Sequence, residues 1–328
     1  MSHRQGPPPA GGGPPGPMPA ATVATAPSTP HRPVHRSRSR MIRRTARRHL
    51  ALAAVAALAL SACGGDEQGA SGDGTGNDCT AGKTLTEGTL TIATGNPAYE
   101  PWVVGDAPES GEGFEAAVAY AVAGALGFAD ANVAWVRTGF DEAIQPGAKN
   151  FDFNLQQYSI TDERKQTVSF SEPYYTSNQA VVGFADSPAV GAESVADLRG
   201  LKFGAQSGTT SLAFITDVIA PDAEPFVYDD NAAAKAALEA KQIDAIVVDL
   251  PTAFYIAAVE IEGGTVIGQF PASEGAEADR FGMVFDLDNP LVECVDAALA
   301  SLRDDGTLAA IEQEWLADKT NAPVISLD

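Results

Sequence analysis

The sequence predicts an α/β fold with largely parallel sheets, and three observations support this prediction. The chain has 328 residues, which is enough for two domains and a sizeable core. From Leu85 onward, short strand-like runs alternate with helical runs, as in sheets whose strands are joined by crossover helices. Polar clusters follow several of the predicted strands, and ligands bind beyond the carboxyl ends of the strands in such sheets.

The strands are expected in short runs that are rich in β-branched and aromatic residues. Glycine, proline and polar clusters bound these runs, as they do at the ends of strands. In chain order the expected strands are 89–94, 132–137, 151–155, 179–185, 201–206, 225–229, 243–249, 265–270 and 281–286.

The helices are expected where apolar residues recur every three or four positions. Residues 113–127 are the clearest case, because their large apolar side chains share one helical face. Pro146 breaks a short helix that begins at Phe140, and Ser194 is a candidate N-cap of another. In chain order the expected helices are 113–127, 140–147, 194–200, 208–220, 230–242, 250–260, 289–303 and 307–318.

The charge of the chain is distributed unevenly along the sequence. The whole chain has a formal charge of −22, but nine arginines and no acidic residue precede Cys63. From Cys63 onward, 12 basic residues (21 − 9) stand against 43 acidic ones, which gives a charge of −31. A chain this acidic is repelled by nucleic acid and by anionic lipid headgroups, so we exclude nucleic-acid binding.

The histidines are confined to the same N-terminal part. His3, His31, His35 and His49 all precede Cys63, so a chain cut there has no histidine. Nucleophile systems that need a histidine base are then excluded, and the commonest zinc ligand is missing. We therefore expect no metal, no cofactor and no enzymatic activity, although catalysis by paired carboxylates stays open.

The N-terminal part has the composition of an extension followed by a secretion signal. Residues 1–40 are rich in Pro, Gly, Ala and Arg and are predicted to be disordered, or untranslated if Met41 is the start. Residues 41–62 combine arginines with a short apolar run and predict a signal peptide. The Leu-Ser-Ala-Cys sequence that ends at Cys63 resembles a bacterial lipobox, which implies lipidation of Cys63.

The segment after Cys63 predicts the location of the folded part. Residues 63–84 begin Gly-rich and acidic and are expected to form a flexible tether. The alternative to a lipid anchor is a short transmembrane anchor over the same apolar run. Both readings place the rest of the chain outside the cytoplasm, at the cell membrane.

Two further cysteines are expected to form a disulfide. Cys79 lies just before the first predicted strand, and Cys294 lies on the apolar face of a C-terminal helix. Outside the cytoplasm such a pair is expected to be oxidised. The alternative is two separate, partly buried thiols.

Three polar features follow predicted strands and are complementary to a zwitterion. The stretch "FDFNLQQYSITDERK" places Ser159 and Arg164 after a strand. The stretch "AQSGTTS" leads into a helix at Thr210, whose free N–H groups favour an anion. Asp249 closes another strand. An arginine and a helix start suit a carboxylate, and a lone carboxylate suits an ammonium group.

At this point the sequence resembles the extracytoplasmic solute-binding proteins of family 3, which serve amino-acid ABC transporters. The resemblance spans about Leu85 to Lys319 and rests on motifs in family order. These are "TGNPAYEPW", "GFEAAVAYAVAGALG", "FDFNLQQYSITDERKQTVSFSEPYY", "SVADLRGLKFGAQSGTT", "AAKAALEAKQIDAIVVD" and "LRDDGTLAAIEQEWL".

The resemblance implies a two-lobed periplasmic-binding-protein fold, with two mixed, mainly parallel sheets joined by two hinge strands. Lobe 1 is expected to comprise 85–183 and 281–320, and lobe 2 to comprise 184–280. The hinge strands are expected at "VVGF" and "DRFG", and residues 321–328 are expected to form a C-terminal tail. Closure of the lobes around a ligand is the expected motion.

The resemblance also implies roles for residues that match the family motifs. Arg164 and Ser159 would bind the α-carboxylate of an amino acid, together with Thr210 and, as a further candidate, Thr209. Asp249 would accept from the α-ammonium group. The remaining candidates are the carbonyl of Gln157, the aromatic walls Tyr99 and Phe140, and Trp102, which would line the cleft.

Departures from the family pattern lie on the side-chain half of the cleft. Gly95 is an extra residue, and Asn96 stands where some relatives carry an acid. Gln156 and Gln157 replace small residues, and their roles stay open. Amide-rich recognition favours a polar ligand side chain, neutral or basic, with glutamine first.

The predicted function is that of a monomeric substrate-binding component of an ABC importer, with the permease subunits as partners. Two other functions stay open. One is a periplasmic cyclohexadienyl-dehydratase-like enzyme, for which Glu100 and Glu172 are candidate acids by position. The other is a ligand-sensing module that docks on a receptor.

Alternative structural roles also stay open for the candidate site residues. They are a surface ion pair for Arg164, an N-cap for Asp249 and core packing for the aromatic residues.

Overall fold

The computed structural model describes residues 74–270, 278–316 and 322–327. The signal peptide, the lipidation site Cys63 and the extension before them lie outside the described residues. Among the residues that are described, no helix is long and apolar enough to cross a membrane.

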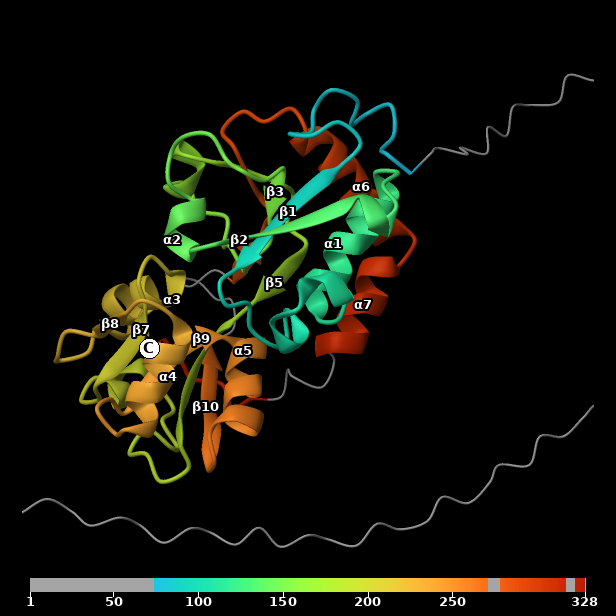
Figure 1. Ribbon diagram of the computed structural model, residues 1–328. Coiled ribbons are helices and arrows are strands. Elements are labelled where there is room, and N and C mark those ends of the chain that lie inside the picture. The colour runs from blue at the N-terminus through green and yellow to red at the C-terminus, as the bar shows by residue number, and fades with distance from the viewer. Residues whose placement is uncertain (1–73, 271–277, 317–321, 328) are drawn as a thin grey trace, which may run out of the picture. The chain divides into compact units, whose positions relative to one another are not determined.

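The first sheet has five strands in the order β2-β1-β3-β12-β4 (Figure 1). The first three pair in parallel, and β12 runs antiparallel to both of its neighbours. The strands are β1 (Leu90–Gly95), β2 (Val133–Thr138), β3 (Phe153–Asn154), β4 (Ser169–Phe170) and β12 (Val284–Phe285).

Three helices pack together against this sheet, and their apolar faces form its main core with Leu90, Ile92 and Phe153. They are α1 (Phe114–Ala125), α6 (Val292–Asp304) and α7 (Thr307–Leu316) (Figure 1). A smaller cluster that includes Phe151, Tyr158 and Val168 lies beside the short helix α2 (Phe140–Ala143). The expected strands and helices of this part of the chain are present, but the helix expected over 140–147 ends at Ala143 and the strand expected over 281–286 is shortened to β12. Strand β4 was not predicted.

The second sheet has the order β10-β6-β9-β7-β8. Strands β9, β7 and β8 are parallel, whereas β6 is antiparallel to both β9 and β10. The strands are β6 (Gln179–Phe184), β7 (Phe203–Gln206), β8 (Phe226–Tyr228), β9 (Ala245–Asp249) and β10 (Gly264–Phe270).

Apolar residues cover both faces of the second sheet, so its strands are hydrophobic on both sides. The helices are α3 (Thr210–Phe214), α4 (Asn231–Glu239) and α5 (Leu250–Tyr255). Helices α3 and α5 each continue into a π-helical turn, Ile215–Ile219 and Ile256–Glu260. The expected helix at 194–200 is a short 3₁₀ turn, Val195–Leu198, with Ser194 at its N-cap.

A two-stranded antiparallel ribbon, β5 (Tyr175–Ser177) and β11 (Asp279–Phe281), connects the two sheets. The architecture is therefore the predicted one: two mixed sheets joined by two hinge strands. The expected hinge at "DRFG" coincides with β11. The expected hinge at "VVGF" is wrong, because β6 is a fully paired strand inside the second sheet and the chain crosses earlier, at β5. The first lobe therefore ends before Gln179 rather than at Gly183.

The C-terminal tail packs against the second sheet. Ile325 is 1% exposed and lies in the core on one face of that sheet. The Ile325 N–H donates to the Gln269 carbonyl at 3.0 Å, and the Gln269 N–H donates to the Pro323 carbonyl at 2.7 Å. A Cβ at Gly268 would lie 2.6 Å from Ile325, so a glycine is required under the tail. Cys79 and Cys294 form a disulfide that joins the segment before β1 to α6.

Candidate ligand-binding site

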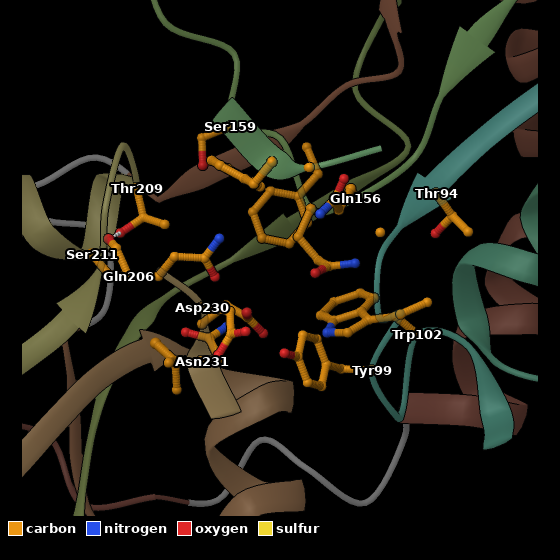
Figure 2. Close-up of a pocket in the computed structure, with 18 of the residues that line it drawn as sticks. Thr94, Tyr99, Trp102, Gln156, Ser159, Gln206, Thr209, Ser211, Asp230 and Asn231 are labelled. Atoms are coloured by element: carbon orange, nitrogen blue, oxygen red, sulfur yellow. Dashed lines mark hydrogen bonds between the residues drawn. The ribbon is translucent and has the colours of Figure 1, made fainter. Parts of the chain in front are cut away.

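A cavity of about 280 Å³ is lined by residues from both sheets and their loops (Figure 2). All eleven residues that the sequence predicted to contact the ligand or to line the cleft are lining residues of this cavity. They are Asn96, Tyr99, Trp102, Phe140, Gln156, Gln157, Ser159, Arg164, Thr209, Thr210 and Asp249. Since these residues come from distant parts of the chain, the fold assembles one polar cavity from them.

Arg164 is a buried cation that has no carboxylate partner among the described residues. Its side chain is 8% exposed and follows β3 on a short 3₁₀ turn. Nη1 donates to the Ser159 carbonyl at 2.7 Å, and Nη2 donates to the Gly208 carbonyl at 2.9 Å. No ion pair of Arg164 occurs within the described residues. Burial lowers the pKa of Arg164, which remains a cation. The alternative reading of Arg164, a surface ion pair, is therefore wrong for the described residues.

The aromatic rings of Phe140 and Tyr158 lie beside the Arg164 guanidinium. The two rings are stacked with centroids 4.5 Å apart. The Arg164 Cζ lies 5.4 Å from the Phe140 centroid and 5.9 Å from the Tyr158 centroid. These cation–π contacts restrict the position of the guanidinium, a group whose planar fork suits a carboxylate.

Hydroxyl groups from both sheets meet next to Arg164. Ser159 Oγ and Thr210 Oγ1 are 3.1 Å apart, although Ser159 follows β3 and Thr210 begins α3. Thr209 caps α3, because its hydroxyl oxygen accepts from the Leu212 N–H at 3.1 Å. The same hydroxyl donates to the Gln206 carbonyl at 2.7 Å. The Thr209 side chain is thus occupied by the backbone, whereas the Ser159 and Thr210 hydroxyls can each turn toward a ligand.

Asp249 is both a helix cap and a cavity residue. It ends β9, and its carboxylate accepts from the Thr252 N–H at 3.0 Å and the Thr252 hydroxyl at 2.8 Å. Burial, which outweighs these hydrogen bonds, raises the pKa of Asp249 to about 6. The two roles considered for this residue are therefore compatible in one geometry.

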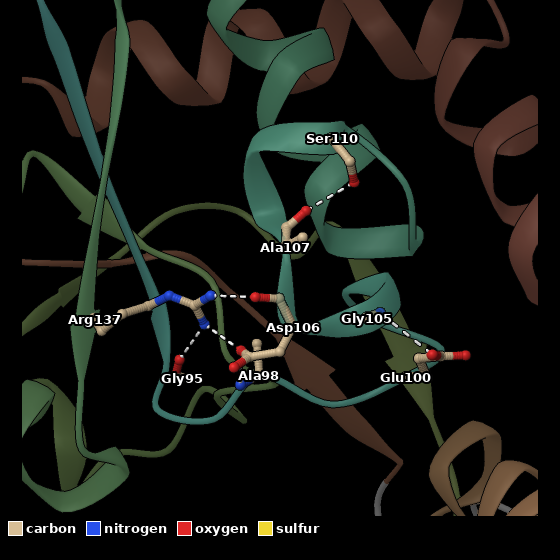
Figure 3. Close-up of polar contacts among 8 residues, drawn as sticks. All are labelled: Gly95, Ala98, Glu100, Gly105, Asp106, Ala107, Ser110 and Arg137. Atoms are coloured by element: carbon tan, nitrogen blue, oxygen red, sulfur yellow. Dashed lines mark hydrogen bonds and ion pairs between the residues drawn. The ribbon is translucent and has the colours of Figure 1, made fainter. Parts of the chain in front are cut away.

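Tyr99 and Trp102 lie between Gly95 and Asp106, on a loop that an internal ion pair holds in place. Figure 3 shows this ion pair, which joins Arg137 to Asp106. Arg137 donates to the Gly95 carbonyl at 2.7 Å and pairs with Asp106 at 2.6 Å. Asp106 in turn accepts from the Ala98 N–H at 2.8 Å. Both ends of the loop are therefore attached to one guanidinium, which sets the position of the Tyr99 ring. The Tyr99 hydroxyl is buried and has no hydrogen-bond partner within the described residues.

Trp102 is a core residue as well as a lining residue. It is 1% exposed, and its ring makes edge contacts with Phe114, Tyr175 and Phe281. Its Nε1 donates to Thr252 Oγ1 at 2.8 Å. The sequence indicated lining rather than direct ligand contact, and this environment agrees with lining.

The two adjacent glutamines have different surroundings. Gln157 adopts a positive φ of 51°, and its N–H donates to Glu115 at 2.8 Å. Its side-chain amide also donates to Glu115, which is 1% exposed and accepts from the Tyr174 hydroxyl as well. In contrast, Oε1 of Gln156 accepts from the Tyr158 hydroxyl at 3.1 Å. Nε2 of Gln156 lies next to Gly95, so that a Cβ on residue 95 would be 2.9 Å from this nitrogen.

Several residues of the cavity were not predicted from the sequence. Gln179 is 7% exposed, and its Oε1 is buried without a partner within the described residues. Gln206, Asp230 and Asn231 also line the cavity. Gln206 ends β7, and Asp230 caps α4. Ligand sites lie at the carboxyl ends of strands in such sheets, and this rule could have identified both residues from the sequence.

The acids nominated for an enzymatic role do not line this cavity. Glu100 accepts from the Gly105 N–H at 3.2 Å in the loop of Figure 3. Glu172 lies beside Asp296, whose carboxylate accepts from the Glu172 N–H at 2.7 Å. Neither carboxylate is part of the site that holds Arg164 and Asp249.

The fold and this site define a class of protein: a two-lobed binding protein whose cavity contains a buried guanidinium and a partly buried carboxylate. Residues 90–318 match the family model described as bacterial extracellular solute-binding proteins, family 3. The chain belongs to this family.

Individual relatives are similar at moderate identity. The chain is 30% identical over 170 residues to the L-cystine-binding protein TcyJ of Escherichia coli (strain K12), which covers 51% of this chain and 61% of that protein. This match spans less than two thirds of the relative's length. The chain is also 27% identical over 245 residues to the arginine-binding periplasmic protein of Mannheimia haemolytica, with coverage of 73% and 96%.

A solved structure shows the same fold. It is an ancestral arginine-binding protein bound to glutamine, with 29% identity and a TM-score of 0.60. The match covers 70% of this chain and 99% of that chain.

Proposed function

We propose that this protein captures an amino acid outside the cytoplasm and delivers it to the permease of an ABC importer by closure of its lobes. The observation that carries the proposal is that Arg164 and Asp249 line the same cavity. A buried guanidinium without a carboxylate partner within the described residues favours an anion, and a buried carboxylate favours a cation. An amino-acid zwitterion supplies both charges on one small molecule.

In this proposal the α-carboxylate lies against Arg164, with hydroxyl donors from Ser159 and Thr210 on either side. The α-ammonium group lies against Asp249, and the Gln157 carbonyl is a second acceptor. Tyr99 and Phe140 form the walls of the side-chain subsite. The named ligands of the relatives, cystine and arginine, are amino acids as well, which supports the ligand class but not its side chain.

The side chain of the ligand is proposed to be polar, neutral or basic. Glutamine was the first candidate because Asn96, Gln156 and Gln157 offer amide groups. The Gln157 amide nitrogen donates to Glu115, so Asn96 and Gln156 remain as the amides that this candidate would use.

The setting of the protein is part of the same proposal. Cys63 carries a lipid after removal of residues 41–62, which attaches a monomer to the outer face of the membrane. The tether expected over 63–84 cannot extend to residue 84, because Asn77 donates to the Leu126 carbonyl, Thr80 is buried and Cys79 is bonded to Cys294. Lobe 1 comprises the residues up to the β5 crossover and those that follow β11. Radiolabelled palmitate incorporated by the full chain but not by Cys63→Ser would support the anchor, and equal labelling of both would contradict it.

Calorimetric titration of the purified protein with the common amino acids tests the binding function. We expect one stoichiometric ligand with a dissociation constant near the micromolar range, which corresponds to about −8 kcal/mol. A thermal-shift screen can precede it, since a ligand at 100 times its dissociation constant adds about 2.7 kcal/mol to the stability. Absence of binding by every amino acid would refute the proposal. Turnover of prephenate or arogenate would favour an enzyme instead.

A further inference from the structure

The charges of the cavity are not balanced by an amino-acid zwitterion. Among the described residues, its lining contains the carboxylates of Asp229, Asp230 and Asp249 but one cation, Arg164. In the proposed complex, the ligand's carboxylate compensates Arg164 and its ammonium compensates Asp249. The ligand backbone thus brings no net charge. Asp229 is exposed to solvent, whereas the partly buried Asp230 is left without a cation among the described residues. Glu115, directly behind Gln157, adds a further buried carboxyl group to the same region.

Asp230 has a carboxylate oxygen available in the cavity. It caps α4, and its Oδ1 accepts from the Ala233 N–H at 2.7 Å. Its Oδ2 takes part in no hydrogen bond or ion pair within the described part of the chain. Oδ1 of Asp230 therefore caps the N-terminus of α4, and Oδ2 is free to accept a hydrogen bond from a ligand.

The Tyr99 hydroxyl points toward the same place. Figure 2 shows Tyr99 directed toward Asp230 and Asn231 from the opposite side of the cavity. The hydroxyl oxygen is buried and has no hydrogen-bond partner within the described residues, although Tyr99 and Asp230 come from different halves of the fold. Burial and then the charge of Asp230 raise the pKa of Tyr99 to about 12, so the hydroxyl stays neutral. The backbone N–H of Ala232 partly offsets this rise in the pKa, so it lies close to the Tyr99 hydroxyl as well. The carboxylate oxygen of Asp230 that is free in the cavity marks a place for a hydrogen-bond donor.

The aromatic walls also favour a cation over a neutral amide. Phe140 and Tyr99 both line the cavity, and the faces of aromatic rings attract a guanidinium or an ammonium group. A neutral amide would use the hydrogen-bond acceptors but would leave the partly buried carboxylate of Asp230 uncompensated. The amides of Asn96 and Gln156 are compatible with either ligand, because each offers both a donor and an acceptor.

We infer that the ligand is an amino acid with a positively charged side chain, and that Asp230 is the residue that selects this charge by accepting a hydrogen bond from it. The inference rests on the proposed amino-acid-binding function and narrows it to one class of side chain. The Tyr99 hydroxyl positions the cationic group from the other side of the cavity.

The test compares ligands that differ in charge but little in shape. Arginine and citrulline are such a pair, and glutamine is the neutral alternative. Calorimetry on the wild-type protein is expected to show arginine or lysine binding at least tenfold tighter than citrulline and glutamine. Asp230→Asn keeps a residue that caps helices well, so α4 is retained. This variant is expected to lose tenfold or more in affinity for the cationic ligand and less than threefold for citrulline.

Asp222→Asn is the matched control, because Asp222 is an exposed acid of the same half of the fold and does not line the cavity. It removes the same charge and is expected to leave the preference unchanged. Tighter binding of glutamine or citrulline than of arginine and lysine by the wild type would overturn the inference while leaving the amino-acid-binding function intact. An equal loss for charged and neutral ligands in Asp230→Asn would overturn the assigned role of Asp230. Failure to bind any amino acid would overturn both proposals.

Discussion

Trp102 and Thr252 form a hydrogen bond between the two halves of the fold: Nε1 of Trp102 donates to Oγ1 of Thr252 at 2.8 Å. The Thr252 hydroxyl donates in turn to Asp249 Oδ2, also at 2.8 Å. An indole of the first half therefore helps to orient, through one hydroxyl, the carboxylate that we propose for the ligand ammonium. Contact between the lobes and assembly of the ammonium subsite are thus linked by the same side chain.

The first prediction concerns Thr252→Val. Valine keeps the shape but removes the hydroxyl, so the Trp102 N–H loses its acceptor and Asp249 loses a donor. Each loss of a hydrogen-bond partner in a buried place costs about 1–3 kcal/mol. Calorimetry should show an affinity at least tenfold weaker. Thr216→Val is the control, because the Thr216 hydroxyl donates to the Leu212 carbonyl on the exposed surface of the same half. Unchanged affinity in Thr252→Val would show that the link has no role in binding.

The second prediction concerns the guanidinium. Arg164→Ala should abolish measurable amino-acid binding while the fold is retained, because the ligand carboxylate would be buried without its partner. The expected loss is about 2–5 kcal/mol. Lys165→Ala is the matched control, since Lys165 is the next residue and pairs with exposed Asp162 at 3.2 Å on the surface. If the two variants bind equally well, Arg164 is not the carboxylate site. Circular dichroism of both variants checks that the fold is kept.

Much of this site could be predicted because its residues follow strands in recognisable local motifs. Ser159, Arg164 and Asp249 each lie just beyond a strand, and the topology of two mixed sheets brings them together. The position of the first hinge was not predictable in the same way. The run Gln179–Phe184 has the composition of any buried strand, and pairing with β9 and β10 determines which sheet it joins.

The surroundings of Gln157 and the role of Asp230 depend on contacts between distant segments. Gln157 lies far from Glu115 in the sequence, and the left-handed backbone that joins them is not encoded by a local motif. The local sequence around Asp230 indicates a helix N-cap, and Asp230 does cap α4. Its place in the cavity follows from the approach of the loop that carries Tyr99, which the sequence alone does not specify.

The third prediction is that ligand affinity falls as the pH is lowered below about 6. Burial raises the pKa of Asp249 in the free cavity to about 6, and the ligand ammonium interacts favourably with the ionised form. Below this pKa a proton must leave before the ligand binds, so the affinity should fall by up to tenfold for each pH unit. Calorimetry from pH 8 to pH 5 measures the profile. In Asp249→Asn the binding should be weak and nearly flat with pH; a wild-type profile that is flat over this range would contradict the assignment.

The fourth prediction concerns Glu115 and the stability of the protein. Burial raises the pKa of Glu115 to about 7, against an ordinary value of 4.5. Between these values the folded protein binds more protons than the unfolded chain. The free energy of unfolding therefore falls as the pH rises from 4.5 to 7, by up to about 1.4 kcal/mol for each pH unit from this group. Urea unfolding from pH 5 to pH 8 should show a shallower decline in Glu115→Gln than in the wild type. Parallel slopes for the two proteins would mean that Glu115 titrates normally.

The fifth prediction concerns the disulfide between Cys79 and Cys294. It closes a long loop, with a sequence separation of 215 residues, and attaches the segment before β1 to α6. Disulfides stabilise by restricting the unfolded chain, and removing a native one typically costs about 2–5 kcal/mol. The double variant Cys79→Ser/Cys294→Ser should unfold at a lower urea concentration than the oxidised wild type. Its affinity for the amino acid should not change, because neither cysteine lines the cavity. Wild-type protein treated with a reductant should behave like the double variant, and a reduced protein as stable as the oxidised one would show that the bond does not contribute.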